Sequence, residues 1–156
     1  MPGHGILRAH RVGVGRHVVR YLVDADVLSE PTRPMPDARV IRWLRGHEAD
    51  LVVDPFILGE IRYGILLLAT GRRRSRLESW FESGVGRLSC LPWDHAMGTR
   101  WAGLLAQLRT AGRSMPVKDS LIATSALVTD LTVVTRHVRD FEPAGMPLLD
   151  PFASGS

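Results

Sequence analysis

The sequence predicts an α/β domain built on a mainly parallel sheet of four to five strands, and two observations lead to this prediction. Short β-branched apolar runs alternate along the chain with longer segments of helical apolar spacing, a pattern typical of parallel sheets that helices cover on both sides. The chain has 156 residues, enough for one hydrophobic core and too few for two domains of ordinary size.

The composition is that of an ordinary globular protein, because 45% of the residues are apolar and 23% are charged. The longest apolar runs fall far short of the roughly 20 residues that cross a bilayer, and no segment has the order of a signal peptide. We therefore predict a cytoplasmic protein with no membrane partner. The single cysteine, Cys90, lies in a strand-like run, which excludes an internal disulfide, disfavours a thiolate metal site and predicts a buried structural thiol.

The net charge of +4 comes from the first 20 residues, which contain four arginines and no acid. The remaining 16 basic residues balance the 16 acidic ones, so the overall charge gives no nucleic-acid signal for the folded part. Glycine- and arginine-rich segments of this kind do not form a core. We predict a basic, disordered tail over residues 1–17, a single domain over 18–152 and a short C-terminal tail over 153–156.

The first predicted strand, residues 18–23, is β-branched and apolar, and Asp24, Ala25 and Asp26 follow it directly. The strand therefore delivers acids at its carboxyl end, the edge at which open α/β folds keep their chemistry. After a proline-rich turn, Asp37 is predicted to cap a short helix.

A second predicted strand, 51–53, precedes Asp54 and Pro55, an N-cap acid and a proline at the first helical position. A helix that carries Glu60 about two turns from its start is expected to follow. The pattern over 72–81 also predicts a helix, with apolar side chains facing inward and arginines outward.

A third strand is predicted at 88–91, and Asp94 is expected to cap a helix that ends where Gly112 adopts the left-handed conformation. Asp119 opens the next predicted helix. The last two predicted strands are 131–134, which ends at Thr135, and 147–149.

Four carboxylates occupy places where burial is unfavourable without a compensating charge: Asp24, Glu60, Asp119 and Asp140. Converging carboxylates repel one another, and a divalent cation that prefers hard oxygen ligands keeps them ionised. Simpler interpretations stand beside this one. Asp119 could be an N-cap only, Asp26 and Asp140 ordinary loop acids, and Glu60 a residue at a solvated helix edge.

Four segments resemble the signatures of the PIN-domain family, and more closely those of its VapC- and FitB-like toxins. They are Tyr-Leu-Val-Asp-Ala-Asp-Val-Leu-Ser-Glu at 21–30, Leu-Gly-Glu-Ile-Arg-Tyr-Gly at 58–64, Pro-Val-Lys-Asp-Ser-Leu-Ile-Ala-Thr-Ser-Ala at 116–126 and Thr-Arg-His-Val-Arg-Asp-Phe at 135–141. Their order and spacing agree over residues 20–152. Two departures bear on the metal ligands: Ala25 and Asp26 stand where the family has Thr-Asn, and His137 stands where it has Asn or Asp.

The resemblance implies a PIN-like three-layer α/β/α fold and an endoribonuclease that depends on Mg²⁺ or Mn²⁺. Its implied catalytic residues and metal ligands are Asp24, Glu60 and Asp119, with Glu60 either a ligand or the base that orients water. Asp26, His137 and Asp140 are peripheral metal-ligand candidates. Thr135 and Ser29 are expected to support the ligands.

The resemblance further implies an RNA substrate such as tRNA, rRNA or mRNA, a homodimer and a small cognate antitoxin that inserts a basic side chain among the acids. Candidate contacts to the RNA backbone are Arg72, Arg73, Arg74, Arg76, Lys118, Arg136 and Arg139. For the run at 72–76, a solvated helix face is the alternative. Protein partners are expected at apolar surfaces near Trp43 and along 57–68.

Two other functions compete with this interpretation. Asp24 and Asp26 after an apolar strand also fit a haloacid-dehalogenase-like phosphatase, as nucleophile and general acid, but Lys118 precedes Thr135 and no acidic pair follows, which is the wrong order for that family. A catalytically inactive PIN-like RNA-binding module is the second, favoured by Ala25 and His137. Glu60 distinguishes the nuclease from the phosphatase, and metal binding distinguishes it from the inactive module.

Overall fold

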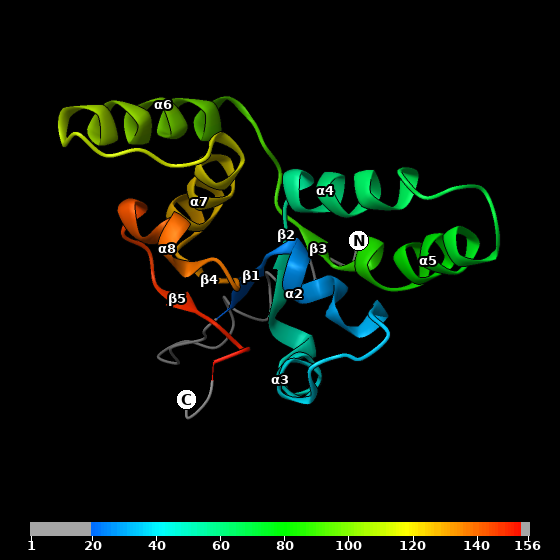
Figure 1. The fold of residues 1–156 in the computed structure, drawn as a ribbon. Helices are drawn as coiled ribbons and strands as arrows, with labels where there is room; N and C mark the ends of the chain where they lie inside the picture. The colour runs from blue at the N-terminus through cyan, green and yellow to red at the C-terminus, as the bar shows by residue number, and fades with distance from the viewer. Residues whose placement is uncertain (1–19, 154–156) are drawn as a thin grey trace.

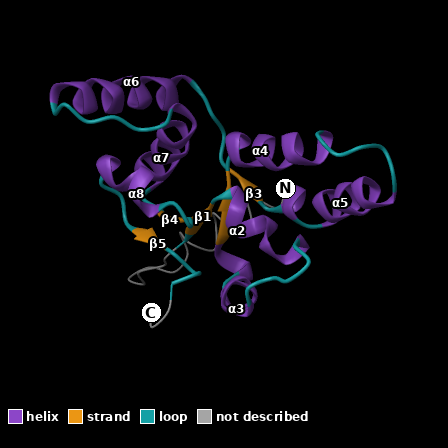
Figure 2. Ribbon diagram, in the orientation of Figure 1, coloured by secondary structure: helices purple, strands orange, loops and turns teal. Residues whose placement is uncertain are grey.

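The computed structural model describes residues 20–153 and contains a five-stranded, fully parallel sheet in the order β3-β2-β1-β4-β5 (Figures 1 and 2). The strands are β1 (Tyr21–Val23), β2 (Leu51–Val53), β3 (Ser89–Cys90), β4 (Thr132–Val134) and β5 (Leu148–Leu149). This confirms the predicted α/β class and the parallel sheet. The basic tail expected at 1–17, the first two residues of the strand expected at 18–23, and residues 154–156 lie outside the described residues.

Seven α-helices alternate with the strands in the described part of the chain. They are α2 (Ala25–Ser29), α3 (Ala38–Gly46), α4 (Pro55–Leu66), α5 (Arg72–Ser83), α6 (His95–Thr110), α7 (Val117–Thr129) and α8 (Val138–Phe141). Single 3-10 turns are η1 (Glu30–Thr32), η2 (Glu48–Asp50), η3 (Val85–Arg87) and η4 (Glu142–Ala144). In the view of Figure 1, α4 and α7 lie above the strands and α3 lies below them, so helices cover both sides of the sheet.

The predicted helix starts follow local side-chain chemistry. The carboxylates of Asp37, Asp54 and Asp94 each accept a hydrogen bond from a backbone N–H in the first turn of α3, α4 and α6. Such caps satisfy donors that the helix itself cannot reach. Gly112 closes the α6 region with a φ of +67°, the left-handed conformation that glycine adopts without steric cost. One prediction was wrong: α7 begins at Val117, so Asp119 does not open it.

The register of the central strands brings chemistry to one edge of the sheet. β1 pairs with β2 and β4, and Val23 is aligned with Val134. The backbone N–H of Asp24 donates to the carbonyl of Val134 at 2.8 Å, so the residues after β1 and β4 are neighbours. Asp24 and Thr135 therefore meet although they are 111 positions apart in sequence. This carboxyl edge is where the predicted acids come together.

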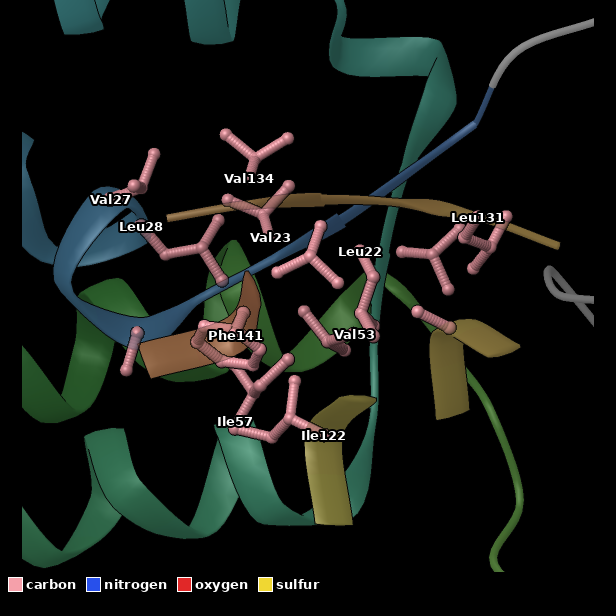
Figure 3. Packing of buried hydrophobic residues seen from close by; sticks show 14 of the residues in the cluster. Leu22, Val23, Val27, Leu28, Val53, Ile57, Ile122, Leu131, Val134 and Phe141 are labelled. Atoms are coloured by element: carbon pink, nitrogen blue, oxygen red, sulfur yellow. The ribbon is translucent and has the colours of Figure 1, made fainter. Parts of the chain in front are cut away.

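The core lies between the sheet and its helices and is made of aliphatic side chains with one central phenylalanine (Figure 3). Leu22, Val23, Ile57 and Ile122 are fully buried, and Phe141 is the largest fully buried side chain. Truncating a buried phenylalanine to alanine typically costs about 3–5 kcal/mol, so these residues fix the strand ends on which the acids sit.

Two further features of the described part bear on the sequence predictions. Cys90 is exposed, and the buried thiol that was predicted is wrong because β3 is an edge strand with one open side. Among residues 20–153, no helix combines the length and the apolar character required to cross a membrane.

Candidate active site

Asp24 is a buried acid at the carboxyl edge of the sheet. It follows the central strand β1, is 5% exposed and caps α2. Its Oδ1 accepts from the backbone N–H of Ala25 at 2.9 Å, and its Oδ2 accepts from the hydroxyl of Thr135 at 2.8 Å. The Thr135 hydroxyl in turn accepts from the backbone N–H of His137 at 3.0 Å. This chain of hydrogen bonds fixes the orientation of the Asp24 carboxylate, as expected for a ligand-supporting threonine.

Burial, together with the negative charges of Asp26 and Glu60, raises the pKa of Asp24 to about 7 against the lowering effect of the hydrogen bonds from Thr135 and Ala25. A carboxyl group with this pKa is only partly ionised at neutral pH. A nearby cation would restore its charge, which is the electrostatic condition for a metal ligand.

Glu60 extends from the second turn of α4 toward the same edge, and its side chain is 33% exposed. Its Oε2 accepts from the ammonium group of Lys118 at 2.8 Å. Its Oε1 is buried and has no hydrogen-bond partner among the described residues. A buried carboxylate oxygen without a partner costs free energy, so this oxygen is a candidate for a bound cation.

Asp119 is the third residue of α7 and is 8% exposed. Pro116 precedes the helix, so the interpretation of Asp119 as an N-cap alone is wrong. Burial raises its pKa, the positive charge of Lys118 lowers it, and the charges of Asp140 and Glu60 raise it. Asp119 therefore lies within electrostatic reach of Glu60 on one side and Asp140, an exposed residue of α8, on the other.

Asp26 lies at the candidate site on a helix, so it is not an ordinary loop acid. It lies in the first turn of α2, where both of its carboxylate oxygens are buried, and the backbone N–H groups of Val27 and Arg136 act on them. Burial raises its pKa. The ring of His137, 60% exposed, places Nε2 3.4 Å from Oδ2 of Asp26. The two departures from the family signatures, at 26 and 137, are thus partners in space.

Within residues 20–153, no three His, Cys, Asp or Glu side chains converge closely enough to hold a metal ion as they stand. The contacts explain why: Glu60 is turned to Lys118, and Asp24 is turned to Thr135 and the N-terminus of α2. The donor chemistry nevertheless fits a hard divalent cation, since the buried side-chain oxygens of Asp26 and Glu60 are carboxylate oxygens, and Oε1 of Glu60 has no hydrogen-bond partner among the described residues. The metal ligands stay a prediction.

A groove of about 290 Å³ runs from the acids toward basic side chains. Asp26, Ser29 and Glu60 line it together with Arg33, Arg73 and Trp80. It adjoins a second hollow of about 210 Å³ to which Arg76 and Leu77 contribute. Arg33 was not among the residues predicted from the sequence, and it lies three positions after the signature segment at 21–30.

The other predicted RNA contacts are dispersed. Arg74 is held on α5 by Glu78 at 3.6 Å, and the guanidinium of Arg136 stacks over the ring of Phe152 at 4.3 Å. Arg72 and Arg139 are exposed, and Lys118 is the partner of Glu60. The arginine run of α5 therefore divides: Arg73 lines the groove and Arg76 the adjoining hollow, whereas Arg74 is paired with Glu78 on the same helix.

A separate, mainly apolar cleft of about 640 Å³ lies between α3, η1 and the end of α5. Its lining residues are Leu28, Pro31, Pro36, Ile41, Leu44, Arg45, Glu48, Leu51, Trp80, Gly84, Val85 and Leu88. Trp43, near which a partner surface was expected, instead packs edge-on to Tyr21 at 5.0 Å. Along 57–68 the apolar residues divide between the core and the surface, where Tyr63 and Leu67 are 63% and 67% exposed.

The chain is similar to several known proteins, although no protein-family model matches it. The plasmid stability protein StbB of Pseudomonas syringae pv. tomato is 33% identical over 135 residues, which cover 84% of this chain and 97% of StbB. Toxin FitB of Neisseria gonorrhoeae is 31% identical over 137 residues, which cover 84% of this chain and 97% of FitB. Ribonuclease VapC4 of Mycobacterium tuberculosis is 32% identical over 133 residues, which cover 84% of this chain and 94% of VapC4.

Solved structures agree with these relatives. The structure of FitAB bound to the IR36 DNA fragment contains a chain with a TM-score of 0.78 and 29% identity, over 87% of this chain and 98% of that one. VapBC-5 from Mycobacterium tuberculosis, described as a member of the VapBC family of toxin–antitoxin systems, gives a TM-score of 0.54 and 28% identity over 64% of this chain and 79% of that one. With the parallel sheet and the sequence signatures, these similarities show that the chain belongs to the PIN-domain family of VapC- and FitB-like toxins.

Proposed function

We propose that this protein is the toxin of a toxin–antitoxin pair and acts as a metal-dependent endoribonuclease that hydrolyses phosphodiester bonds in RNA. The names of its relatives, Toxin FitB and Ribonuclease VapC4, support the activity class. The observation that carries the proposal is that Asp24 after β1, Glu60 of α4 and Asp119 of α7 lie at one edge of the sheet, where the charge of Glu60 acts on both aspartates and the pKa of the buried Asp24 is raised to about 7. An RNA substrate places this activity in the cytoplasm.

The residues that would hold Mg²⁺ or Mn²⁺ are Asp24, Glu60 and Asp119, with Asp26 as a neighbouring acid. When bound, such an ion polarises the scissile phosphate and lowers the pKa of the attacking water. Thr135 keeps the Asp24 carboxylate in place through its 2.8 Å hydrogen bond. Ser29, beside Asp26 and Glu60 in the groove, is proposed to support the site from α2.

The groove supplies a path for RNA beside the acids. Arg33, Arg73 and Arg76 line it and its extension, and guanidinium groups pair well with phosphates. A phosphate next to the scissile one would lie along these arginines, whereas the acids with their cation take the scissile phosphate. This division assigns affinity to the arginines and chemistry to the acids.

The same proposal includes a cognate antitoxin and a homodimer. The apolar cleft between α3, η1 and the end of α5 offers a concave, largely hydrophobic surface to an amphipathic antitoxin segment, as helix-in-groove recognition requires. The exposed Tyr63, Leu66 and Leu67 at the end of α4 form an apolar patch suited to a second copy of the chain.

Incubation of the purified full-length chain with total cellular RNA and Mn²⁺ or Mg²⁺, with mapping of new 5′ ends, tests the activity. Cleavage should require metal, stop with EDTA and be lost in Glu60→Gln. A phosphatase would keep its activity in Glu60→Gln, and membership of the PIN-domain toxins does not favour that function. A well-folded, antitoxin-free chain that cuts no RNA and binds neither metal would favour an inactive binding module.

A further inference from the structure

The side chain of Lys118 places an ammonium group among the acids at the carboxyl edge of the sheet. It precedes Asp119 at the start of α7, and its Nζ lies 2.8 Å from Oε2 of Glu60 on α4, 58 positions earlier in the chain. The pair is partly open to solvent, with 51% of the Lys118 side chain and 33% of the Glu60 side chain exposed. This is the contact that joins α4 to α7 across the candidate site.

The surroundings of Lys118 are those of a bound cation. The negative charges of Glu60, Asp119 and Asp24 all act on its ammonium group. These are the three acids to which the proposed function assigns the metal. The ring of His137 lies beside Asp26 and acts on Asp119 as well.

One carboxylate carries a single negative charge, so it cannot neutralise a divalent ion and an ammonium group together, and these two cations repel each other at the same site. Glu60 divides its oxygens accordingly: Oε2 is taken by Lys118, and Oε1 is buried without a partner among the described residues.

We propose that Lys118 is a positioning residue that acts as an internal counter-ion: it neutralises Glu60 when no metal is bound, competes with the divalent ion, and is released by metal toward the RNA phosphate. The proposal rests on the proposed function, since it takes Glu60 as a metal ligand. Lys118 thereby links loading of the metal to the appearance of a free positive charge for RNA.

The test is calorimetric titration of the full-length chain with Mn²⁺ alone, in the absence of RNA. Lys118→Met should bind Mn²⁺ about two- to fivefold more tightly than the original protein, the size expected for a partly exposed ion pair. Lys118→Arg, which keeps the charge, should bind as the original does. Arg109→Met removes one charge from the last turn of α6 and controls for net charge, so it should have the smaller effect.

Equal or weaker Mn²⁺ binding by Lys118→Met, or an increase no larger than that of Arg109→Met, would overturn the proposal. Lys118→Gln repeats the measurement should the methionine variant unfold. Cleavage of RNA by the original protein is measured in parallel. If it binds Mn²⁺ and cleaves while Lys118→Met binds no more tightly, the counter-ion proposal fails and the nuclease stands. If neither protein binds Mn²⁺ and no RNA is cut, both fail.

Discussion

Substitution of Thr135 by valine tests how the site controls the charge of Asp24. Valine has nearly the shape of threonine, so the fully buried position stays filled while the donor to Asp24 Oδ2 is lost. Hydrogen bonds to charged groups contribute about 1.5–3 kcal/mol. Because one pKa unit corresponds to about 1.4 kcal/mol, the pKa of Asp24, about 7 in the original protein, should rise by about one to two units.

The assay is Mn²⁺ binding at a fixed, subsaturating concentration as a function of pH. Protons and metal compete for Asp24, so the pH at which half of the protein is loaded should increase by about one to two units in Thr135→Val. RNA cleavage at neutral pH should decrease about tenfold and recover at alkaline pH. Thr135→Ser keeps the hydroxyl and should follow the original protein. An unchanged pH midpoint in Thr135→Val would refute the argument that this hydrogen bond sets the charge of Asp24.

Four further predictions concern stability, substrate and partner. Asp24→Asn should stabilise the metal-free protein at pH 8 relative to the original protein, and much less at pH 4.5. The folded-state pKa of Asp24 is raised from 3.8 to about 7, so the original protein loses stability as the pH rises through this interval. Thermal melting in EDTA measures the difference. Ser125→Ala, which removes a 2.7 Å donor from the fully buried Asp54, should lower the free energy of unfolding by about 1–3 kcal/mol in urea titrations and leave Mn²⁺ affinity unchanged. Arg73→Ala should weaken RNA binding and lower the salt dependence of that binding by about one counter-ion. Ile41→Asp in the apolar cleft should abolish antitoxin binding in a pull-down, while RNA cleavage continues.

For each of these predictions, one contrary result would contradict the interpretation of the structure. An Asp24→Asn variant that is stabilised equally at pH 8 and pH 4.5 would mean that the Asp24 carboxyl group does not have a raised pKa. Loss of Mn²⁺ affinity in Ser125→Ala would place Asp54 in the metal site. Unchanged salt dependence in Arg73→Ala would remove the groove from the RNA path, and antitoxin binding by Ile41→Asp would remove the cleft from that interface.

The sequence could predict what local chemistry determines. The caps at Asp37, Asp54 and Asp94 depend on contacts within three residues, so their positions could be read directly from the chain. The apolar run before Asp24 predicted the central strand in the same way. Membership in the family could also be recognised, because its signatures are short and contiguous.

Contacts between distant segments could not be predicted from local patterns. The pair of Lys118 and Glu60 joins residues 58 positions apart, and each fits its own helix without reference to the other. Cys90 was assigned to a buried strand because sequence shows a strand but not its place at the edge of a sheet. Asp26 was open to interpretation as a loop acid, and the fold of α2 is what buries its oxygens.

The most direct test of the central claim is RNA cleavage by the original protein and by Asp119→Asn in the presence of Mn²⁺, with Mn²⁺ binding measured on the same samples. Asp119 comes from α7, so its requirement would show that acids brought by different elements act as one site. The account predicts metal-dependent cleavage by the original protein and loss of both cleavage and tight Mn²⁺ binding in the variant. Cleavage that persists in Asp119→Asn, or that proceeds in EDTA, would contradict it.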